Sequence, residues 1–253
     1  MPLDDRAPRR LFVAPGSLAS NHVTITGPDH RHLALVLRAR KGDPLTLLDG
    51  CGRARRGTVS DVGRSETLLQ LGAEERCPPD PPVRLTVAQA APKGDRFSEV
   101  VQHGTEAGAW AFVPLLTERG VVRLDAMDAE GRTARWQAVA KGAAEQSGRG
   151  SVPAILPPTP LAQMVREWGA DCLVLHPGGL RLSETIGLAP GLQPGGAACL
   201  AVGPEGGFAE REIEDARRGG AAVVSIGPYV FRSETAAVAA VAILLDRIGR
   251  GAA

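Results

Sequence analysis

From residue 83 onward, short apolar runs alternate with helical segments, and this alternation limits the folds open to the chain. We expect strands at 83–90, 111–116, 171–176, 197–203 and 221–227, and helices at about 95–107, 130–146, 160–168 and 233–248. The strands are almost uninterrupted apolar runs, which indicates that both faces of their sheet are covered. Strands that alternate with helices favour a parallel sheet. The sequence therefore predicts an α/β domain over residues 83–253.

A different pattern precedes the proline-rich string CPPDPP at 77–82. Prolines fix φ and remove backbone donors, so we interpret this string as a linker. Before it we expect short strands at 10–14, 44–49, 54–62 and 66–72. One helix is expected at 30–40, because Leu33, Val36 and Leu37 are spaced to share a helical face. These elements predict a small, mostly antiparallel β-barrel domain over residues 1–77.

The charge is distributed unevenly along the 253 residues. The net charge is +1, but residues 1–56 carry ten Lys or Arg and five Asp or Glu. A basic N-terminal region suggests a polyanionic partner. Only three of the basic residues are lysines. Arginine suits forked contacts to phosphate. Codon bias in a GC-rich genome is a slightly better explanation of the arginine excess itself, but not of its clustering near the N-terminus.

Several classes of protein are disfavoured by the sequence. No apolar run reaches the roughly 18 residues of a membrane span, and the N-terminus does not have the pattern of a secretory signal. The four cysteines form no CxxC pair, and no His, Asp and Glu cluster has metal-ligand spacing, so we expect no metal. We interpret the cysteines as buried thiols of a cytoplasmic protein.

Three late strands end in unusual loops, with the sequences LVLHPGG (173–179), LAVGPEGGF (200–208) and VVSIGPYVFRSETAA (223–237). Ligands of open parallel sheets bind at the carboxyl ends of the strands. A single loop of this kind is most simply an ordinary strand-to-helix turn, but three together predict one pocket. We expect Gly203 and Gly206 to need the backbone freedom of glycine, since a ligand would approach the main chain there.

The known phosphate-binding motifs are absent from these loops. There is no GxxxxGK[ST] sequence, and no GxGxxG follows the first strand of a βαβ unit. Glu210 and Glu212 lie in the predicted first turn of a helix, where acids would repel phosphate. An adenosine with a cationic tail fits the loops better, and S-adenosyl-L-methionine is a ligand of that kind. The missing dinucleotide fingerprint also disfavours a nicotinamide-dependent oxidoreductase.

Seven segments carry a resemblance to a known family. They are RRLFV (9–13), HLALVLRARKGD (32–43), QAAPKGDR (89–96), EQSGRGSVP (145–153), LHPGG (175–179), VGPEGGFAEREI (202–213) and IGPYVFRSETAA (226–237). In this order they make the chain resemble the bacterial 16S ribosomal RNA (uracil-N3)-methyltransferases of the SPOUT class. The segment TEAGAWAFVP (105–114) departs from the family pattern.

The resemblance implies a PUA-like RNA-binding N-terminal domain and a C-terminal SPOUT domain with a trefoil knot. It implies a homodimer that methylates N3 of a uridine in 16S ribosomal RNA of the 30S subunit, with S-adenosyl-L-methionine as cofactor. The knot loops would bind the cofactor. The residues implied for that role are Leu175, His176, Pro177, Gly178, Val202, Gly203, Pro204, Glu205, Gly206, Gly207, Ile226, Gly227, Val230 and Phe231.

Uracil N3 carries a proton in neutral uridine, so the reaction needs stabilisation of the anion that forms when the proton leaves. Arg232 is the first candidate for that role, with a phosphate or structural contact as the alternative. Glu234 is a candidate base, or it orients Arg232; equally, it is an ordinary acid in the first turn of a helix that Ser233 caps. Glu205 binds the cofactor's amino groups or only holds its own loop.

The candidate RNA-binding residues come from both predicted domains: Arg9, Arg10, His32, Arg38, Lys93, Arg96, Arg119, Glu145, Gln146 and Arg149. For His32, packing on a helix face is the equal alternative. Two other functions remain open at this stage. One is a non-catalytic RNA-binding protein that keeps the fold, and the other is a methyltransferase acting on another RNA site.

Overall fold

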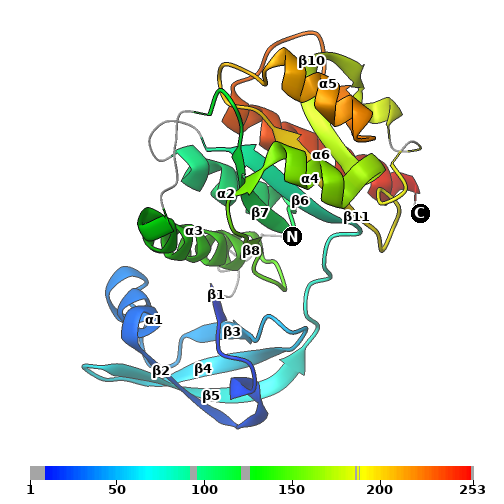
Figure 1. Ribbon diagram of the computed structural model, residues 1–253. Helices are drawn as coiled ribbons and strands as arrows, with labels where there is room; N and C mark the ends of the chain where they lie inside the picture. The colour runs from blue at the N-terminus through cyan, green and yellow to red at the C-terminus, as the bar shows by residue number, and fades with distance from the viewer. Residues whose placement is uncertain (1–8, 92–95, 121–125, 186, 188, 252–253) are drawn as a thin grey trace. The chain divides into compact units, whose positions relative to one another are not determined.

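The computed structural model describes residues 9–91, 96–120, 126–185, 187 and 189–251. The chain forms two compact units (Figure 1). Unit 1 contains Met1–Asp80 and Ala144–Val152, and unit 2 contains Pro81–Ala143 and Pro153–Ala253. Residues 144–152 group with the N-terminal residues, whereas the sequence placed them in the α/β domain.

Unit 1 is built on a five-stranded sheet with the order β1-β3-β4-β5-β2. The strands are β1 (Arg9–Phe12), β2 (His22–Thr26), β3 (Pro44–Leu48), β4 (Ala54–Val62) and β5 (Glu66–Glu75). β1 pairs with β3 in parallel and the other pairs are antiparallel. Buried and exposed residues alternate along β2 and β5, as expected for strands with one face on a core. The four predicted strands are present, and β2 was missed.

The predicted helix at 30–40 is wrong. Helix α1 spans only Gly27–Arg31, and a single π-helical turn, η2, follows at His32–Val36. The wider turn changes the residue spacing, so Leu33 is buried in the core whereas Val36 is 68% exposed. Arg38 then takes a positive φ of 50°, which no α-helix tolerates. A short 3-10 turn, η1 (Ser17–Ala19), also lies among the described residues of unit 1.

The proline string forms no helix or strand, as predicted, but it packs closely against residues 150 and 151. The Ser151 hydroxyl donates to an Asp80 carboxylate oxygen at 2.6 Å. A Cβ atom on Gly150 would lie 2.5 Å from the Pro78 carbonyl oxygen, so this contact requires glycine. Ala144 and Val152 pack with Phe12, Leu48 and Ala54 in a small core. Residues 77–80 of the string are therefore an anchored part of unit 1, whereas Pro81 and Pro82 belong to unit 2.

The cysteines differ in environment. Cys172 and Cys199 are buried side by side on neighbouring strands, and the hydrogen bond with Cys172, together with burial, raises the pKa of the Cys199 thiol. Cys51 is exposed, and Cys77 is only partly buried. The interpretation of all four as buried thiols is therefore wrong for Cys51 and Cys77.

Unit 2 contains a parallel sheet with the strand order β12-β10-β11-β6-β7-β8, and β9 pairs with β7. The strands are β6 (Arg84–Ala90), β7 (Ala111–Leu116), β8 (Ala154–Ile155), β9 (Thr159–Pro160), β10 (Cys172–Arg181), β11 (Ala197–Val202) and β12 (Ala222–Ser225). Every pairing in this sheet is parallel. The predicted α/β class is therefore confirmed. The two-residue strands β8 and β9 were not predicted.

Helices cover both faces of this sheet (Figure 1). The helices are α2 (Arg96–Ala107), α3 (Ala126–Ser147), α4 (Leu161–Trp168), α5 (Glu210–Arg218) and α6 (Ser233–Gly251), with short turns η3 (Gly169–Asp171) and η4 (Leu182–Glu184). Helices α4 and α5 share a core with alternate strand residues such as Cys199 and Ala201. Helices α2 and α6 pack together, and Gly104 of α2 lies against the Phe112 ring. No helix of the described residues is long and apolar enough to cross a membrane.

Candidate functional site: a pocket at the carboxyl ends of three strands

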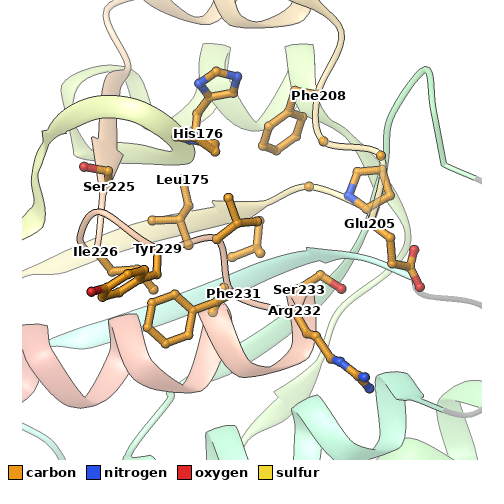
Figure 2. A pocket seen from close by; sticks show the side chains of 18 of the residues that line it. Leu175, His176, Glu205, Phe208, Ser225, Ile226, Tyr229, Phe231, Arg232 and Ser233 are labelled. Atoms are coloured by element: carbon orange, nitrogen blue, oxygen red, sulfur yellow. The ribbon is translucent and has the colours of Figure 1, made fainter.

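A cavity of about 570 Å³ lies where β11 and β12 end and where β10, which was predicted to end at 176 but runs to Arg181, is interrupted (Figure 2). All three predicted loops contribute to its wall. Thirteen of the fourteen residues proposed for the cofactor line it: Leu175, His176, Pro177, Val202, Gly203, Pro204, Glu205, Gly206, Gly207, Ile226, Gly227, Val230 and Phe231. Gly178 belongs to the same loop but not to the lining. Parallel pairing brings these loops together because it places all carboxyl ends at one edge.

The first loop is an interruption within β10. Leu175 and Leu180 both pair with Val224 of β12, so residues 176–179 leave the ladder as a bulge. The Ser225 hydroxyl donates to the Gly179 carbonyl at 3.0 Å and closes the bulge against β12. A strand that continued in regular register would point alternate residues to opposite faces. The bulge instead carries His176 and Pro177 into the pocket wall.

The GPEGG loop, residues 203–207, follows β11 and is anchored by buried groups. Phe208 is 4% exposed and joins the core beneath α4 and α5. The buried Gln89 amide donates to the Gly203 carbonyl oxygen at 3.4 Å. Gly207 has φ +66°, whereas the φ of Gly206 is not positive, and a Cβ atom on Gly206 would come no closer than 4.0 Å to a neighbouring atom, Arg119 Cδ. The conformational requirement for glycine therefore lies at Gly207 rather than at Gly206.

Arg119 connects this loop to the turn after β7. Its guanidinium donates to the carbonyl oxygens of Gly206 at 3.0 Å and of Phe208 at 3.3 Å. The Glu118 amide in the same turn donates to Glu212 Oε1 at 2.9 Å, and Arg211 pairs with the Glu118 carboxylate at 2.6 Å. Arg119 was predicted as an RNA contact. In the structure it lines the pocket and bonds to the GPEGG loop that forms part of the pocket wall.

Glu205 and Arg96 form an ion pair of 3.3 Å, with side chains 41% and 43% exposed. Arg96 begins α2, so the pair connects the GPEGG loop to that helix. A partnered carboxylate places little uncompensated negative charge at the pocket rim. Lys93, the other predicted RNA contact of this segment, lies outside the described residues.

The last loop leads into α6 and contributes exposed side chains. Tyr229 and Val230 are 81% and 83% exposed, and Phe231 is 40% exposed. Arg232 lines the pocket and makes no hydrogen bond or ion pair through its guanidinium with the described residues. Figure 2 shows Arg232 and Glu205 at one end of the pocket and His176 at the other. Arg232 therefore presents an available cation at that end.

Glu234 follows in the first turn of α6 and does not line the pocket. It is partly buried, and its carboxylate accepts a hydrogen bond from the Ser233 hydroxyl at 3.3 Å. Ser233 itself is buried and lines the pocket. An acid at this position interacts favourably with the amino end of the helix.

The remaining predicted RNA contacts belong to unit 1. Arg9, His32, Arg38 and Gln146 are exposed. Arg10 lies beside Gly148, where a Cβ atom would be 2.8 Å from the guanidinium. Glu145 accepts a hydrogen bond from the Phe12 amide at 2.9 Å. Burial lowers the pKa of the Arg149 guanidinium. Glu145 therefore has a structural contact within unit 1, whatever else it binds.

Five lining residues were not among the predicted ones: Phe208, Ser225, Tyr229, Ser233 and Ala236. Phe208, Tyr229 and Ser233 lie within the loops that were singled out, so their position in the sequence was a usable signal. Ser225 and Ala236 also lie within the quoted stretch 223–237, but the structure places them inside β12 and α6. Among the described residues, no group of three or more His, Cys, Asp or Glu is placed to hold a metal ion.

Comparisons with known proteins agree with this geometry. A model of the RNA methyltransferase domain matches residues 79–245, and the chain belongs to this family of RNA methyltransferases. Its relatives include the ribosomal RNA small subunit methyltransferase E of Mycobacterium tuberculosis, 37% identical over 88% of this chain and 87% of that protein. The protein of the same name from Synechocystis sp. is 35% identical over 92% of this chain and 76% of its own length.

Solved structures give the same result. The ribosomal RNA small subunit methyltransferase E of Neisseria gonorrhoeae, bound to S-adenosyl methionine, superposes with a TM-score of 0.79 at 31% identity. The match covers 93% of this chain and 95% of that one. A Legionella pneumophila protein solved with the cofactor SAM has a TM-score of 0.83 at 30% identity, covering 94% and 96% of the two chains.

Proposed function

We propose that the protein transfers a methyl group from S-adenosyl-L-methionine to N3 of a uridine in 16S ribosomal RNA of the small subunit. The observation that carries this proposal is the pocket formed by three glycine-containing loops, one within β10 and two at the carboxyl ends of β11 and β12. It occurs in a member of the RNA methyltransferase family whose relatives are named for the small ribosomal subunit.

The pocket suits an adenosine-containing ligand without phosphates. Its volume of about 570 Å³ is within the range of small-molecule sites. Leu175, Val202 and Ile226 give it an apolar wall, and the main chain of residues 203–207 is available for hydrogen bonds to an adenine edge. Glu210 and Glu212 begin α5 directly after the loop, which disfavours phosphate there. The cofactor would supply an electrophilic methyl group on a sulfonium.

Arg232 is the residue we assign to stabilising the uracil anion. Its guanidinium makes no competing interaction among the described residues, and it lines the pocket. A preorganised cation near O2 or O4 would favour loss of the N3 proton. Glu234 stays a second candidate, as base or as a residue that orients Arg232. Its place in the first turn of α6, bonded to Ser233, fits an ordinary helix start equally well.

The domain assignments belong to the same proposal. Residues 1–77 would form a PUA-like barrel that binds RNA, and the basic bias of residues 1–56 supports this role. Residues 83–253 would form a SPOUT domain whose C-terminal segment is tied in a trefoil knot. The exposed Tyr229 and Val230 beside the pocket are suited to a homodimer interface. We place the protein in the cytoplasm, where its ribosomal substrate would be found.

The test has two stages. Titration calorimetry should show binding of S-adenosyl-L-methionine by the purified protein. Incubation with 30S subunits, or with naked 16S RNA, and tritiated cofactor should then label the RNA, and mass spectrometry of its nucleosides should identify 3-methyluridine. Failure to bind the cofactor would favour a non-catalytic RNA-binding protein. Labelling of another nucleoside would favour a methyltransferase for a different RNA site.

A further inference from the structure

Two neighbouring aliphatic side chains are exposed on unit 1. Leu35 is 72% exposed and Val36 is 68% exposed, both in the π-helical turn η2. We call this pair the apolar tip. Exposed single aliphatic residues are common, but two adjacent ones in one turn, both more than two-thirds exposed, indicate a contact surface.

The backbone on both sides holds the apolar tip in place. Leu33 before it is fully buried, and Ala39 after it is 8% exposed. The Leu37 amide donates to the His32 carbonyl and the Ala39 amide donates to the Leu33 carbonyl, both at 2.9 Å. These bonds enclose the pair, so Leu35 and Val36 project from an anchored turn. π-turns are often found at functional sites.

Positive charge surrounds the apolar tip along the chain. Arg31, Arg38, Arg40 and Lys41 are exposed, and no Asp or Glu lies between residues 30 and 42. The following turn is fixed, because the Arg40 amide donates to Asp43 Oδ2 at 2.9 Å and the Gly42 amide donates to the Val59 carbonyl at 2.8 Å. Arg38 keeps a positive φ of 50° beside the tip.

We propose that the apolar tip packs against unpaired bases of a single-stranded RNA segment, while the flanking cations contact its phosphates. This inference rests on the proposed function and names the RNA element that unit 1 would bind. An aliphatic protein surface would be a poor match for the four cations, which outnumber the flanking acids Asp29 and Asp43. Unpaired bases offer apolar faces next to phosphates, whereas the bases of an RNA helix are stacked on each other.

The test uses a fluorescein-labelled 20-nucleotide single-stranded RNA and the same RNA annealed to its complement. Fluorescence anisotropy would be measured at several salt concentrations for the full-length protein. The Leu35→Ser, Val36→Ser double variant should bind the single strand about tenfold more weakly. Its salt dependence should be unchanged, because no phosphate contact is lost. Affinity for the duplex should change little.

Two further variants separate apolar from ionic contacts. Arg40→Gln with Lys41→Gln should lower the slope of log K against log salt by about 0.7 for each phosphate contact that is lost. Leu68→Ser is the matched control, since Leu68 is 37% exposed on β5 of the same unit. It should leave both the affinity and the slope unchanged.

Unchanged single-strand affinity in the Leu35→Ser, Val36→Ser variant would overturn the inference. An equal loss of affinity for the RNA duplex would also overturn it. So would a variant that loses only self-association in sedimentation equilibrium, because the partner of the apolar tip would then be a second copy of the chain. Methyl transfer by the wild-type protein to 30S subunits is measured in parallel. If the wild type transfers no methyl group, the proposed function fails. If the wild type is active but the Leu35→Ser, Val36→Ser variant binds single-stranded RNA normally, only the inference about the apolar tip is refuted.

Discussion

At the residue scale, Arg232 provides the most direct test of the chemistry. If its charge acts on the uracil anion, Arg232→Ala should lower the rate of methyl transfer by roughly 10²–10³-fold, the effect of losing one preorganised donor. Cofactor affinity should change little. Arg232→Lys should recover part of the rate, because it keeps the charge but loses the fork.

The pH dependence gives a second measurement on the same variants. Solvent hydroxide removes the N3 proton more easily at higher pH, so raising the pH should help Arg232→Ala more than the wild type. Single-turnover methylation of 30S subunits across pH measures this for all three proteins. If Arg232→Ala instead binds the cofactor weakly and has a normal chemical step, Arg232 only builds the pocket.

Gly207 tests the backbone of the cofactor loop. Its φ of +66° is strained for any residue with a Cβ atom, while the neighbouring Gly206 has an ordinary φ. Gly207→Ala should lower the free energy of unfolding by about 1 kcal/mol. Gly206→Ala is the matched control, and it should cost less. Urea unfolding compares the two, and an equal loss in both would contradict the assignment of the requirement to Gly207.

At the element scale, the turn after β7 and the GPEGG loop should act as one structure, because Arg119 bridges them through two carbonyl oxygens. Arg119→Ala should weaken S-adenosyl-L-methionine binding by roughly three- to tenfold, the loss expected for exposed charged hydrogen bonds. Arg119→Lys should restore part of the affinity, because both bonds come from the single Nη1 atom and an ammonium also carries several donors. Titration calorimetry gives the affinities.

Arg211→Ala is the control for this bridge. Its pair with Glu118 is largely exposed, and such pairs contribute little. Cofactor affinity should stay close to that of the wild type. If Arg119→Ala kept its cofactor affinity but lost salt-dependent RNA binding, the original prediction of an RNA contact would be the better one.

The elements that could be predicted are those whose pattern is set locally. Strands of unit 2 such as β6 and β11 were predictable, because a strand covered on both faces is apolar at nearly every position. Residues 30–40 were not, because the periodicity of Leu33, Val36 and Leu37 is compatible with a helix that the π-turn and Arg38 interrupt. Two-residue strands such as β8 are too short to show any period.

The same limit applies to the candidate site. The loops were predictable from their glycines and their place after apolar runs, and thirteen of their proposed residues do line the pocket. The Arg119 bridge was not, because its carbonyl partners at Gly206 and Phe208 lie almost ninety residues away and carry no sequence signal. Contacts made through main-chain oxygens are independent of side-chain identity, so no residue pattern records them.

At the scale of the whole molecule, the chain contributes to unit 1 twice. Residues 144–152 return to unit 1 after residues 81–143, which belong to unit 2. The Glu145 carboxylate accepts from the Phe12 amide of β1, and Ala144 is fully buried against Phe12 and Leu48. A domain boundary placed only in the proline string would therefore separate residues 144–152 from the rest of unit 1.

This arrangement predicts the behaviour of fragments. A fragment of residues 1–80 would lack the acceptor for the Phe12 amide and the side chains of Ala144 and Val152 that cover Leu48 and Ala54. One charge-assisted hydrogen bond and two small apolar side chains are together worth on the order of 2–4 kcal/mol. The fragment should therefore unfold at a lower urea concentration than the same fragment joined through a flexible Gly/Ser linker to residues 144–152. Circular dichroism measures both transitions. Glu145→Ala within the joined fragment should remove about 1–2 kcal/mol of the difference, and equal stability of the two fragments would mean that residues 144–152 are dispensable for unit 1.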